Sequence, residues 1–263
     1  MIVSRKEKVL RLLIVLPSFL VVLIFVYGFI LWTIRTSVGN WKGIIPDFTF
    51  TGLDNYITLF KNERFQKDLW NTVFFTLFFL FFTISLGLIM ALLLDNMAKG
   101  VSVFRSVFLF PMAISFVITG IVWRWIFSPS VGINAVLRAI GMSWAQWGWY
   151  TDTTRIGPFH IALIPVIIAA TWQLTGYTMA MFLAGLRSIP TEVFEAGVMD
   201  GANSFHIVFS IVIPLLRPII LSALIILGHI SLKIFDLVYT MTGKGPAFVT
   251  DFPGIFMFET TFG

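Results

Sequence analysis

Five long apolar stretches constrain this chain more than any other feature of its sequence. They cover about residues 12–34, 69–94, 105–127, 159–183 and 219–238. Each is long enough for an α-helix to cross a bilayer, which takes about 20 residues. A segment inside a bilayer has no water to satisfy its N–H and C=O groups, so outside closed barrels it must be helical. The sequence therefore predicts an all-α, polytopic integral membrane protein with five transmembrane helices in the given chain.

The composition agrees with a membrane domain and excludes several other functions. Charged residues make up 12% of the chain, against about a quarter in a soluble globular domain. The net charge of +5 comes from scattered Lys and Arg residues, whereas a nucleic-acid partner would require a basic patch. The absence of cysteine excludes disulfides, thiolate metal sites and cysteine catalysis. We predict a single transmembrane domain over residues 1–263.

The charges around the first apolar stretch predict its orientation. Four basic residues precede the stretch and two follow soon after it: Arg5, Lys6, Lys8 and Arg11, then Arg35 and Lys42. Because basic flanks favour the cytoplasm, we expect a cytoplasmic N-terminus, with segments 36–68 and 128–157 outside. The stretch exceeds the ~7–15 apolar residues of a signal peptide, so we expect it to be retained. Over the whole chain more Lys and Arg would lie outside than inside, so the orientation depends on this first helix.

Between the fourth and fifth stretches, residues 187–214 carry signals for two short helices joined by a glycine turn. Pro190 suits the first position of a helix, and Glu195 lies close enough to that end for the helix dipole to favour an acid. Gly201 ends this helix, and Ser204 can cap the next one. Periodicity alone leaves two alternatives, a plain connector at the membrane surface and a docking element for a partner.

The residues of this loop favour the docking element. The loop contains Glu195-Ala196-Gly197, Asp200-Gly201-Ala202 and then Ile213-Pro214. These residues and their spacing resemble the EAA loop of permease subunits from binding-protein-dependent ABC importers. The segments that begin at Trp172, Phe182 and Phe235 look like the sugar and glycerol-phosphate branch, in its maltose-type first subunit. Two departures are Gly197, where the motif usually has alanine, and Lys244, where the branch often has glycine.

The resemblance covers the chain from Asn55 to the end and implies an ABC importer type I permease fold. In that family another membrane helix follows, so the given chain would stop just before it. The resemblance also implies that the loop couples to an ATPase through Glu195, Ala196, Gly197, Asp200, Gly201 and Ala202. The implied partners are a second homologous permease subunit, two ATP-binding subunits and an extracytoplasmic substrate-binding protein. The implied location is the cell membrane of a prokaryote.

No arrangement of residues predicts catalysis by this chain. His160, His206 and His229 are scattered, so we predict no metal site, and the sequence has no Gly-rich Lys-Ser/Thr loop to bind ATP phosphates. We therefore predict a non-catalytic subunit that binds no cofactor. ATP and magnesium would be held by the separate ATPase subunit.

Polar residues at membrane depth are candidates for a substrate path, because burying them without a purpose is costly. Gln173 and Tyr177 lie one helical turn apart, with Trp172 beside them. Gln and Tyr can hydrogen-bond sugar hydroxyls, and an aromatic ring can stack on a sugar. The alternative is that Gln173 bonds a neighbouring helix, an interaction of about 0.6 kcal/mol on average. The sequence favours neither the substrate path nor the interhelical bond for Gln173.

Lys233 and Asp236 lie near one face of the fifth stretch, three residues apart and toward its outer end. We expect them to form an ion pair there, and a role in the substrate path is the alternative. An anionic substrate would call for an unpaired cation deeper in the membrane. The sequence shows none, which favours a neutral sugar over glycerol phosphate.

Trp144, Trp147, Trp149 and Tyr150 form a further aromatic cluster. Anchoring at the membrane interface is favoured over a carbohydrate platform, because Trp and Tyr are enriched there.

Together these features predict a permease subunit that forms the translocation pathway for a sugar or oligosaccharide by alternating access. A glycerol-phosphate importer permease is the nearest alternative. An ion-coupled secondary transporter would show two matching halves with buried carboxylates at mid-depth, and the sequence has neither. A non-catalytic scaffold for an enzyme complex would leave Gln173 and Tyr177 without a purpose.

Overall fold

The computed structural model describes residues 5–263 apart from 42, 44, 98, 143 and 145. Lys42 and the side chains of residues 5–11, which include the basic N-terminal flank, lie outside this description. The chain divides into two compact units, Met1–Asn62 and Glu63–Gly263, which are described separately. Almost all regular structure is helical, which confirms the all-α prediction. Within the described residues the sheet is limited to β1 (Arg155–Ile156) and β2 (Phe159–His160), paired antiparallel.

The first unit is dominated by one long apolar helix. It comprises α1 (Arg5–Val22), the π-helical turn η1 (Leu23–Tyr27) and α2 (Gly28–Ser37). Its segment Leu12–Ser37 is long and apolar enough to cross a membrane, and its side chains are mostly exposed within the unit. The first apolar stretch is thus confirmed as a helix of membrane-spanning length.

A short folded segment follows this helix and fixes α3 (Asp54–Lys61) to its end. Gly39 and Phe50 form an antiparallel bridge, and the N–H of Asn40 donates to the Thr49 carbonyl. The Asn55 amide donates to the carbonyl oxygens of Ser37 (3.0 Å) and Gly39 (2.8 Å). Asn55 thus explains how α3 is attached to the end of α2.

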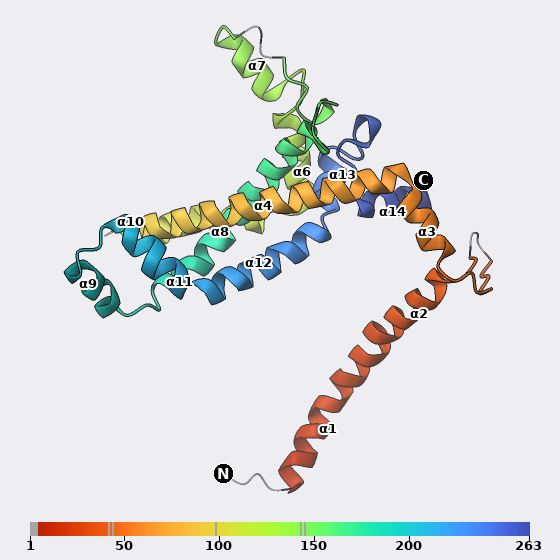
Figure 1. Ribbon diagram of the computed structural model, residues 1–263, viewed down its shortest axis with the longest axis horizontal. Coiled ribbons are helices and arrows are strands. Elements are labelled where there is room, and N and C mark those ends of the chain that lie inside the picture. Colours follow the sequence, from red (N-terminus) through yellow and green to blue (C-terminus); the bar gives the residue numbers. More distant parts are fainter. Residues whose placement is uncertain (1–4, 42, 44, 98, 143, 145) are drawn as a thin grey trace. The chain divides into compact units, whose positions relative to one another are not determined.

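Two uninterrupted helices form the centre of the second unit. They are α4 (Glu63–Asp95) and α8 (Ile164–Leu186), the latter preceded by the 3-10 turn η4 (Ile161–Leu163). The two run along each other (Figure 1). One face of α4 is buried at intervals of three or four residues: Asp68, Asn71, Phe75, Phe79, Thr83, Gly87, Ala91 and Leu94. Gly87 permits the close approach, because a Cβ there would lie 2.7 Å from Thr178 Cβ.

The third predicted helix is broken, so the prediction of one continuous helix over 105–127 is wrong. It consists of α5 (Val101–Leu109), the 3-10 turn η2 (Phe110–Ala113) and α6 (Phe116–Ile126), with a bend of 95°. Pro111 has no N–H to continue the α-helical ladder. Ile114 is extended, and Ser115 Oγ accepts a hydrogen bond from the N–H of Val117, which caps α6.

The fifth predicted helix is also interrupted. The helix α12 (Arg217–Leu232) ends before Lys233, and α13 (Asp236–Met241) starts anew. The helix α13 packs against α6 at Gly120, where an added Cβ would lie 2.0 Å from Thr240 Oγ1. This packing between two broken spans outweighs the local preference for a straight helix. The prediction of one helix over 219–238 is therefore wrong.

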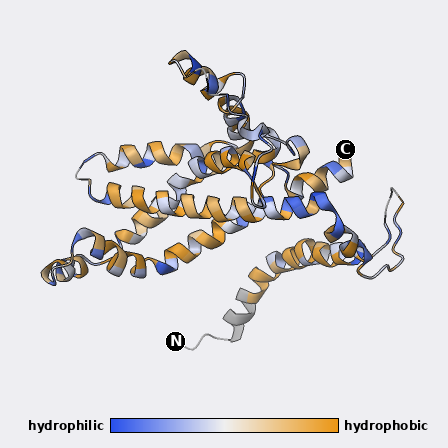
Figure 2. Ribbon diagram, turned by 45° about the horizontal axis from the view of Figure 1, so that its top comes forward, coloured by the Kyte–Doolittle hydropathy of each residue, from blue (hydrophilic) through white to orange (hydrophobic). Residues whose placement is uncertain are grey.

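Among the described residues, counting spans by length and composition gives three, or up to five if each bent helix pair is one span. The bent pairs are Val101–Ala113 with Phe116–Ile126 and Ser204–Leu215 with Arg217–Leu232. Figure 2 shows apolar residues along the lengths of the long helices and hydrophilic residues where α4 begins.

The remaining elements are short. The helix α7 spans Gly132–Ala139. The 3-10 turns η3 (Trp149–Thr151) and η6 (Pro246–Phe248) precede α8 and α14 (Pro253–Phe262), respectively. The aromatic cluster forms as expected: the Trp147 ring lies 6.1 Å from Trp144 and 5.2 Å from Trp149. Its anchoring at a membrane interface stays a prediction.

Candidate functional site

The predicted loop forms a helix, a glycine turn and a second helical segment at one end of the second unit (Figure 1). Its elements are α9 (Thr191–Met199), α10 (Ser204–His206), the π-helical turn η5 (Ile207–Val212) and α11 (Ile213–Leu215). Gly201 has φ +80° and its N–H donates to the Val198 carbonyl, as a helix-ending glycine should.

Two details of the predicted loop need correction. Pro190 lies just before α9 in an extended conformation, so the helix begins at Thr191. Asn203, rather than Ser204, caps the second segment, because Asn203 Oδ1 accepts from the N–H of His206 at 2.8 Å. An Asn side chain reaches this N–H three residues on as well as a Ser does, and the sequence offered both.

The residues expected to couple to an ATPase divide into exposed and packed groups. The side chain of Glu195 is exposed, as are Ala196, Asp200 and Gly201, whereas Ala202 is half-buried. Gly197 is buried, and a Cβ there would lie 2.8 Å from Ile211 Cδ1. The acids therefore face outward, while Gly197 lies at the contact between α9 and η5.

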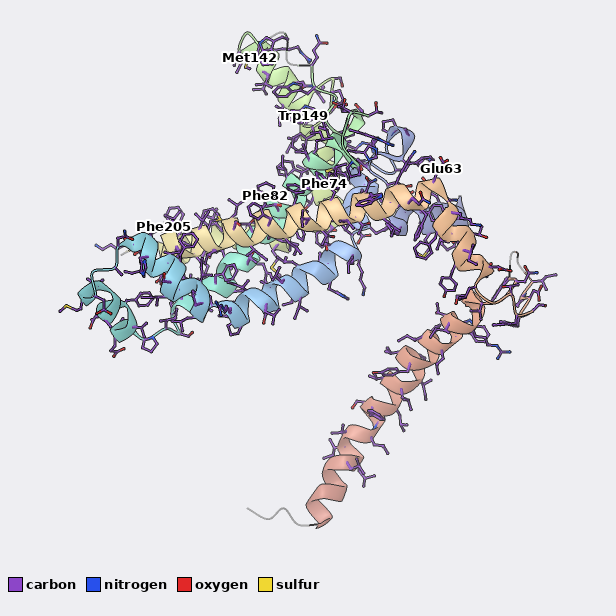
Figure 3. All side chains as sticks on the ribbon, in the orientation of Figure 1. Glu63, Phe74, Phe82, Met142, Trp149 and Phe205 are labelled. Atoms are coloured by element: carbon purple, nitrogen blue, oxygen red, sulfur yellow. The ribbon has the colours of Figure 1, made fainter. Side chains whose placement is uncertain are left out.

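Large apolar side chains are exposed beside these acids. We define the docking surface as Val198, Met199, Phe205 and Phe209, of which Met199 is the most exposed at 86%. The rings of Phe205 and Phe209 lie 4.3 Å apart, and Phe205 is labelled in Figure 3. The start of the loop is attached to the end of α4, because Arg187 Nε lies 3.5 Å from Asp95 Oδ1. An exposed apolar surface of this kind, edged by acids, is typical of a site for a protein partner.

Gln173 is buried, with 2% exposure, and its Nε2 donates to the Ile114 carbonyl at 2.7 Å. This carbonyl lies in the break between α5 and α6. In this conformation the structure therefore favours the interhelical alternative for Gln173. Gln173 Oε1 and Thr119 Oγ1 are also buried, and among the described residues neither has a hydrogen-bond partner.

Trp172 has different surroundings from Gln173. It is 42% exposed, contacts the Trp123 ring at 5.6 Å, and lines an apolar groove of about 960 Å³ between α4, α5 and α8. Phe74 and Phe82 of α4 also line the groove (Figure 3). Tyr177 is half-buried. The structure thus does not bring Trp172 and Gln173 into one polar site.

The predicted ion pair between Lys233 and Asp236 is wrong. Both side chains are exposed, and the break between α12 and α13 removes the i, i+3 geometry. In the part of the chain that the structure describes, neither residue takes part in an ion pair. A role for either residue in the substrate path stays a prediction.

A buried polar network at the opposite end of the unit escaped the sequence analysis. Arg64 donates to the carboxylates of Asp251 and, at 2.8 Å, Glu259. Lys244 Nζ lies 3.2 Å from the same Glu259 oxygen. Asn71 Nδ2 donates to the carbonyls of Phe248 (3.3 Å) and Asp251 (3.0 Å). The signal was the i, i+4, i+7 spacing of Arg64, Asp68 and Asn71, which puts them on one face of α4.

The architecture of broken spans around α4 and α8, with a charged loop at one end, can be compared with known proteins. The family described as the binding-protein-dependent transport system inner membrane component matches residues 7–263. The chain belongs to this family. It is therefore a multi-pass membrane permease, and in this family the permease subunits are non-catalytic.

Curated relatives agree with the family. A probable ABC transporter permease of Pyrococcus horikoshii is 38% identical over 252 residues, which cover 95% of this chain and 84% of the relative. The trehalose/maltose transport system permease MalF of Thermococcus litoralis is 33% identical over 250 residues, covering 93% and 81%.

A solved structure shares the fold. The bacterial ABC transporter involved in the import of alginate contains a chain that superposes with a TM-score of 0.78 at 23% identity. The superposition covers 98% of this chain and 85% of that one. The likeness confirms the predicted importer permease fold.

Proposed function

We propose that this permease and a second, related permease subunit form the pathway through which a sugar or oligosaccharide crosses the membrane by ATP-driven alternating access. The observation that supports this most is the docking surface with its exposed acids, on a chain whose sequence has no phosphate-binding loop. Such a chain needs an ATPase on a separate subunit, and the loop at residues 187–214 offers a contact for that subunit. Sugar as the cargo follows the trehalose/maltose relative.

Membership of the binding-protein-dependent transport family supports the remaining partners. Two ATP-binding subunits would hold ATP and magnesium, and this chain would bind no cofactor. An extracytoplasmic binding protein would deliver the substrate, as suggested by the alginate transporter, which was solved with a substrate-bound periplasmic protein. We propose that the N-terminus lies in the cytoplasm, together with the docking loop, residues 187–214, which carries the docking surface.

Buried polar atoms near the break support a substrate path there. Gln173 Oε1 and Thr119 Oγ1 lack partners among the described residues, and burying an unpaired polar atom is costly. A rearrangement of α6 would release Ile114 from Gln173 and present these atoms to sugar hydroxyls. A glycerol phosphate is the second candidate cargo, because Lys233 is exposed and has no ion-pair partner in the described chain.

Reconstitution tests the proposed function directly. The chain is placed in vesicles with its candidate permease partner, ATPase and binding protein, and uptake of labelled maltose, trehalose and glycerol phosphate is measured. We expect sugar uptake that requires ATP. Uptake driven by an ion gradient without ATP would show a secondary transporter, and a complex that assembles without any transport would favour a scaffold.

The proposed topology predicts which positions react with reagents added outside the cell. Single cysteines are introduced at Asn62, Ser130 and Asn203 of this cysteine-free chain. We expect an impermeant thiol reagent to label positions 62 and 130 in intact cells and position 203 only after lysis. Labelling of position 203 from outside, with position 62 protected, would reverse the topology.

Alanine at Gln173 and Tyr177 tests the proposed path. We expect the double variant to assemble normally and to lose uptake by about tenfold, equivalent to about 1.4 kcal/mol. Met181→Ala, a half-buried truncation one turn further along α8, serves as the control and should retain uptake. Normal uptake by the double variant over the full substrate range would leave only the packing role of Gln173.

A further inference from the structure

Two buried carboxyl groups lie side by side where α4 begins. Asp68 on α4 and Asp251, just before α14, are both 0% exposed. Arg64 and Asn71, one turn to either side of Asp68, both donate to Asp251, so Asp251 lies on the face of α4 that carries Asp68. Their surroundings differ. Asp251 accepts from Arg64 Nε and from the N–H of Phe252 at 3.0 Å. In the described structure neither oxygen of Asp68 has a hydrogen-bond donor.

The charged groups around the pair leave Asp68 without a counter-ion. Arg64 on α4 bonds Asp251 and Glu259, and Glu259 also pairs with Lys244. Lys67 is half-buried, with Nζ 5.8 Å from the centre of the Phe248 ring. On the β-strand side, His160 and Arg155 face Asn71, one turn along from Asp68. No ion pair to Asp68 occurs among the residues described.

A buried carboxylate without a donor or counter-ion is strongly disfavoured, whereas its acid form is neutral and can donate one hydrogen bond. Asp251 is the group beside it that can accept that bond, because the hydrogen bonds from Arg64 and Phe252 favour the charged form of Asp251 over that of Asp68. We propose that Asp68 takes a proton from water and donates it in a hydrogen bond to the Asp251 carboxylate. The pair is then a buried proton-binding site that holds segment 243–252 on α4.

This segment needs such an anchor. Ala247 and Phe248 both have positive φ, 52° and 65°, which side chains with a Cβ resist. Besides the carboxyl pair, Asn71 holds the segment through the carbonyls of Phe248 and Asp251. Loss of the proton from Asp68 would place two negative charges together and push the segment away from α4. The anchor is independent of the cargo and of the ATPase.

His160 supports the anchor with the opposite response to pH. Its Nε2 accepts from Arg155 Nε at 2.9 Å, so Nδ1 carries the proton and donates to Asn71 Oδ1 at 3.0 Å. Burial lowers the pKa of His160, and the charges of Arg155 and Lys67 lower it further. His160 is therefore neutral in the fold, and its protonation in acid would break the bond from Arg155.

Infrared spectroscopy of the purified, full-length protein tests for the proton. We expect a carbonyl band of a protonated carboxylic acid at neutral pH, which shifts in D₂O and disappears as the pH rises. Asp68→Asn should remove the band, while Asp152→Asn, at a half-buried carboxylate that accepts from the N–H of Thr154, should leave it unchanged. If the parent protein shows no acid band at neutral pH, the proposal is overturned. A band that persists in Asp68→Asn overturns the assignment in the same way.

Thermal unfolding over about pH 5 to 9 tests the anchor separately. With Asp68 protonated, the folded state binds more protons than the unfolded state, so the free energy of unfolding should fall as pH rises. Asp68→Asn copies the acid form, which can donate to Asp251, and should remove the decline at high pH. The decline at low pH, due to His160, should remain. Equal declines at high pH in parent and variant would contradict the anchor.

A bound cation is the competing occupant of the pair. Sodium chloride and choline chloride are compared at equal ionic strength and fixed pH. We expect the unfolding midpoint to be the same in both salts. A sodium-specific rise in the parent that is absent in Asp68→Asn would replace the proton with a sodium ion and overturn the proposal.

Discussion

Replacing Gly176 by alanine is expected to destabilise the second unit strongly. A Cβ at this position would lie 1.8 Å from the carbonyl oxygen of Phe108 and 2.5 Å from its carbonyl carbon. These are backbone atoms of α5, so no rotamer change can relieve the overlap. The helices α5 and α8 would have to separate. Overpacking of this kind costs about 1–3 kcal/mol and occasionally more.

The control for this change is Gly228→Ala, another glycine inside a long apolar helix. A Cβ at Gly228 would meet no atom within 4 Å, and alanine is the better helix former by about 1 kcal/mol. We therefore expect Gly176→Ala to lower the unfolding midpoint and the yield of folded protein, while Gly228→Ala leaves both unchanged or raises them. Equal stability of the two variants would contradict the close packing of α5 on α8.

The membrane-spanning stretches were predictable because apolar length is a strong signal in a bilayer. The stretches that became α4 and α8 were located to within a few residues at most ends. The main error for α4 is its start at Glu63 instead of Leu69. Hydropathy places the start of a span where ionisable residues stop, but Arg64 and Asp68 are ionisable and still helical. Asp68 is buried, and Arg64 bonds Asp251, almost 190 residues further along the chain.

The breaks at 110–115 and 233–235 were not predictable from hydropathy, because the residues on both sides are apolar. Pro111 was visible, but proline is tolerated inside membrane helices when neighbours satisfy the freed carbonyl. The deciding contacts are tertiary: Gln173 bonds the Ile114 carbonyl, and Gly120 allows α13 to pack on α6. The break at 233–235 separates Lys233 from Asp236, which is why the expected ion pair is absent from the described structure.

The candidate sites differ in how far the sequence could define them. The loop with Glu195 and Gly201 was predictable, because a short motif fixes both its turn and its exposed acids. The path residues were not, since exposure and partners of Gln173 depend on where other helices lie. The Asp68 and Asp251 pair combines residues far apart in the chain, and only the one-face spacing on α4 pointed to it.

Glu195→Lys and Gly201→Val are expected to disable the docking loop in different ways. Glu195 is exposed, so its reversal should leave folding and membrane insertion intact. At a partner contact the new charge would cost several kcal/mol of complementarity. We expect loss of complex stability, or loss of substrate-stimulated ATP hydrolysis by about tenfold or more. Gly201 instead has φ +80° with open space around it. Gly201→Val would therefore strain only the backbone, which costs about 1–2 kcal/mol of loop stability.

Matched variants separate these causes. Gly201→Asn should be tolerated, because Asn adopts positive φ more readily than Val. Gly197→Ala should also be nearly neutral, because the nearest atom is the flexible end of Ile211, and Glu192→Lys reverses another exposed charge on α9. Pull-down of the ATPase and substrate-stimulated hydrolysis in reconstituted membranes provide the measurements. If Glu195→Lys and Gly201→Val both bind the ATPase and respond to substrate as the parent does, the loop is only a connector. A strong loss in Glu192→Lys alone would place the contact on the first turn of α9 instead of around Glu195.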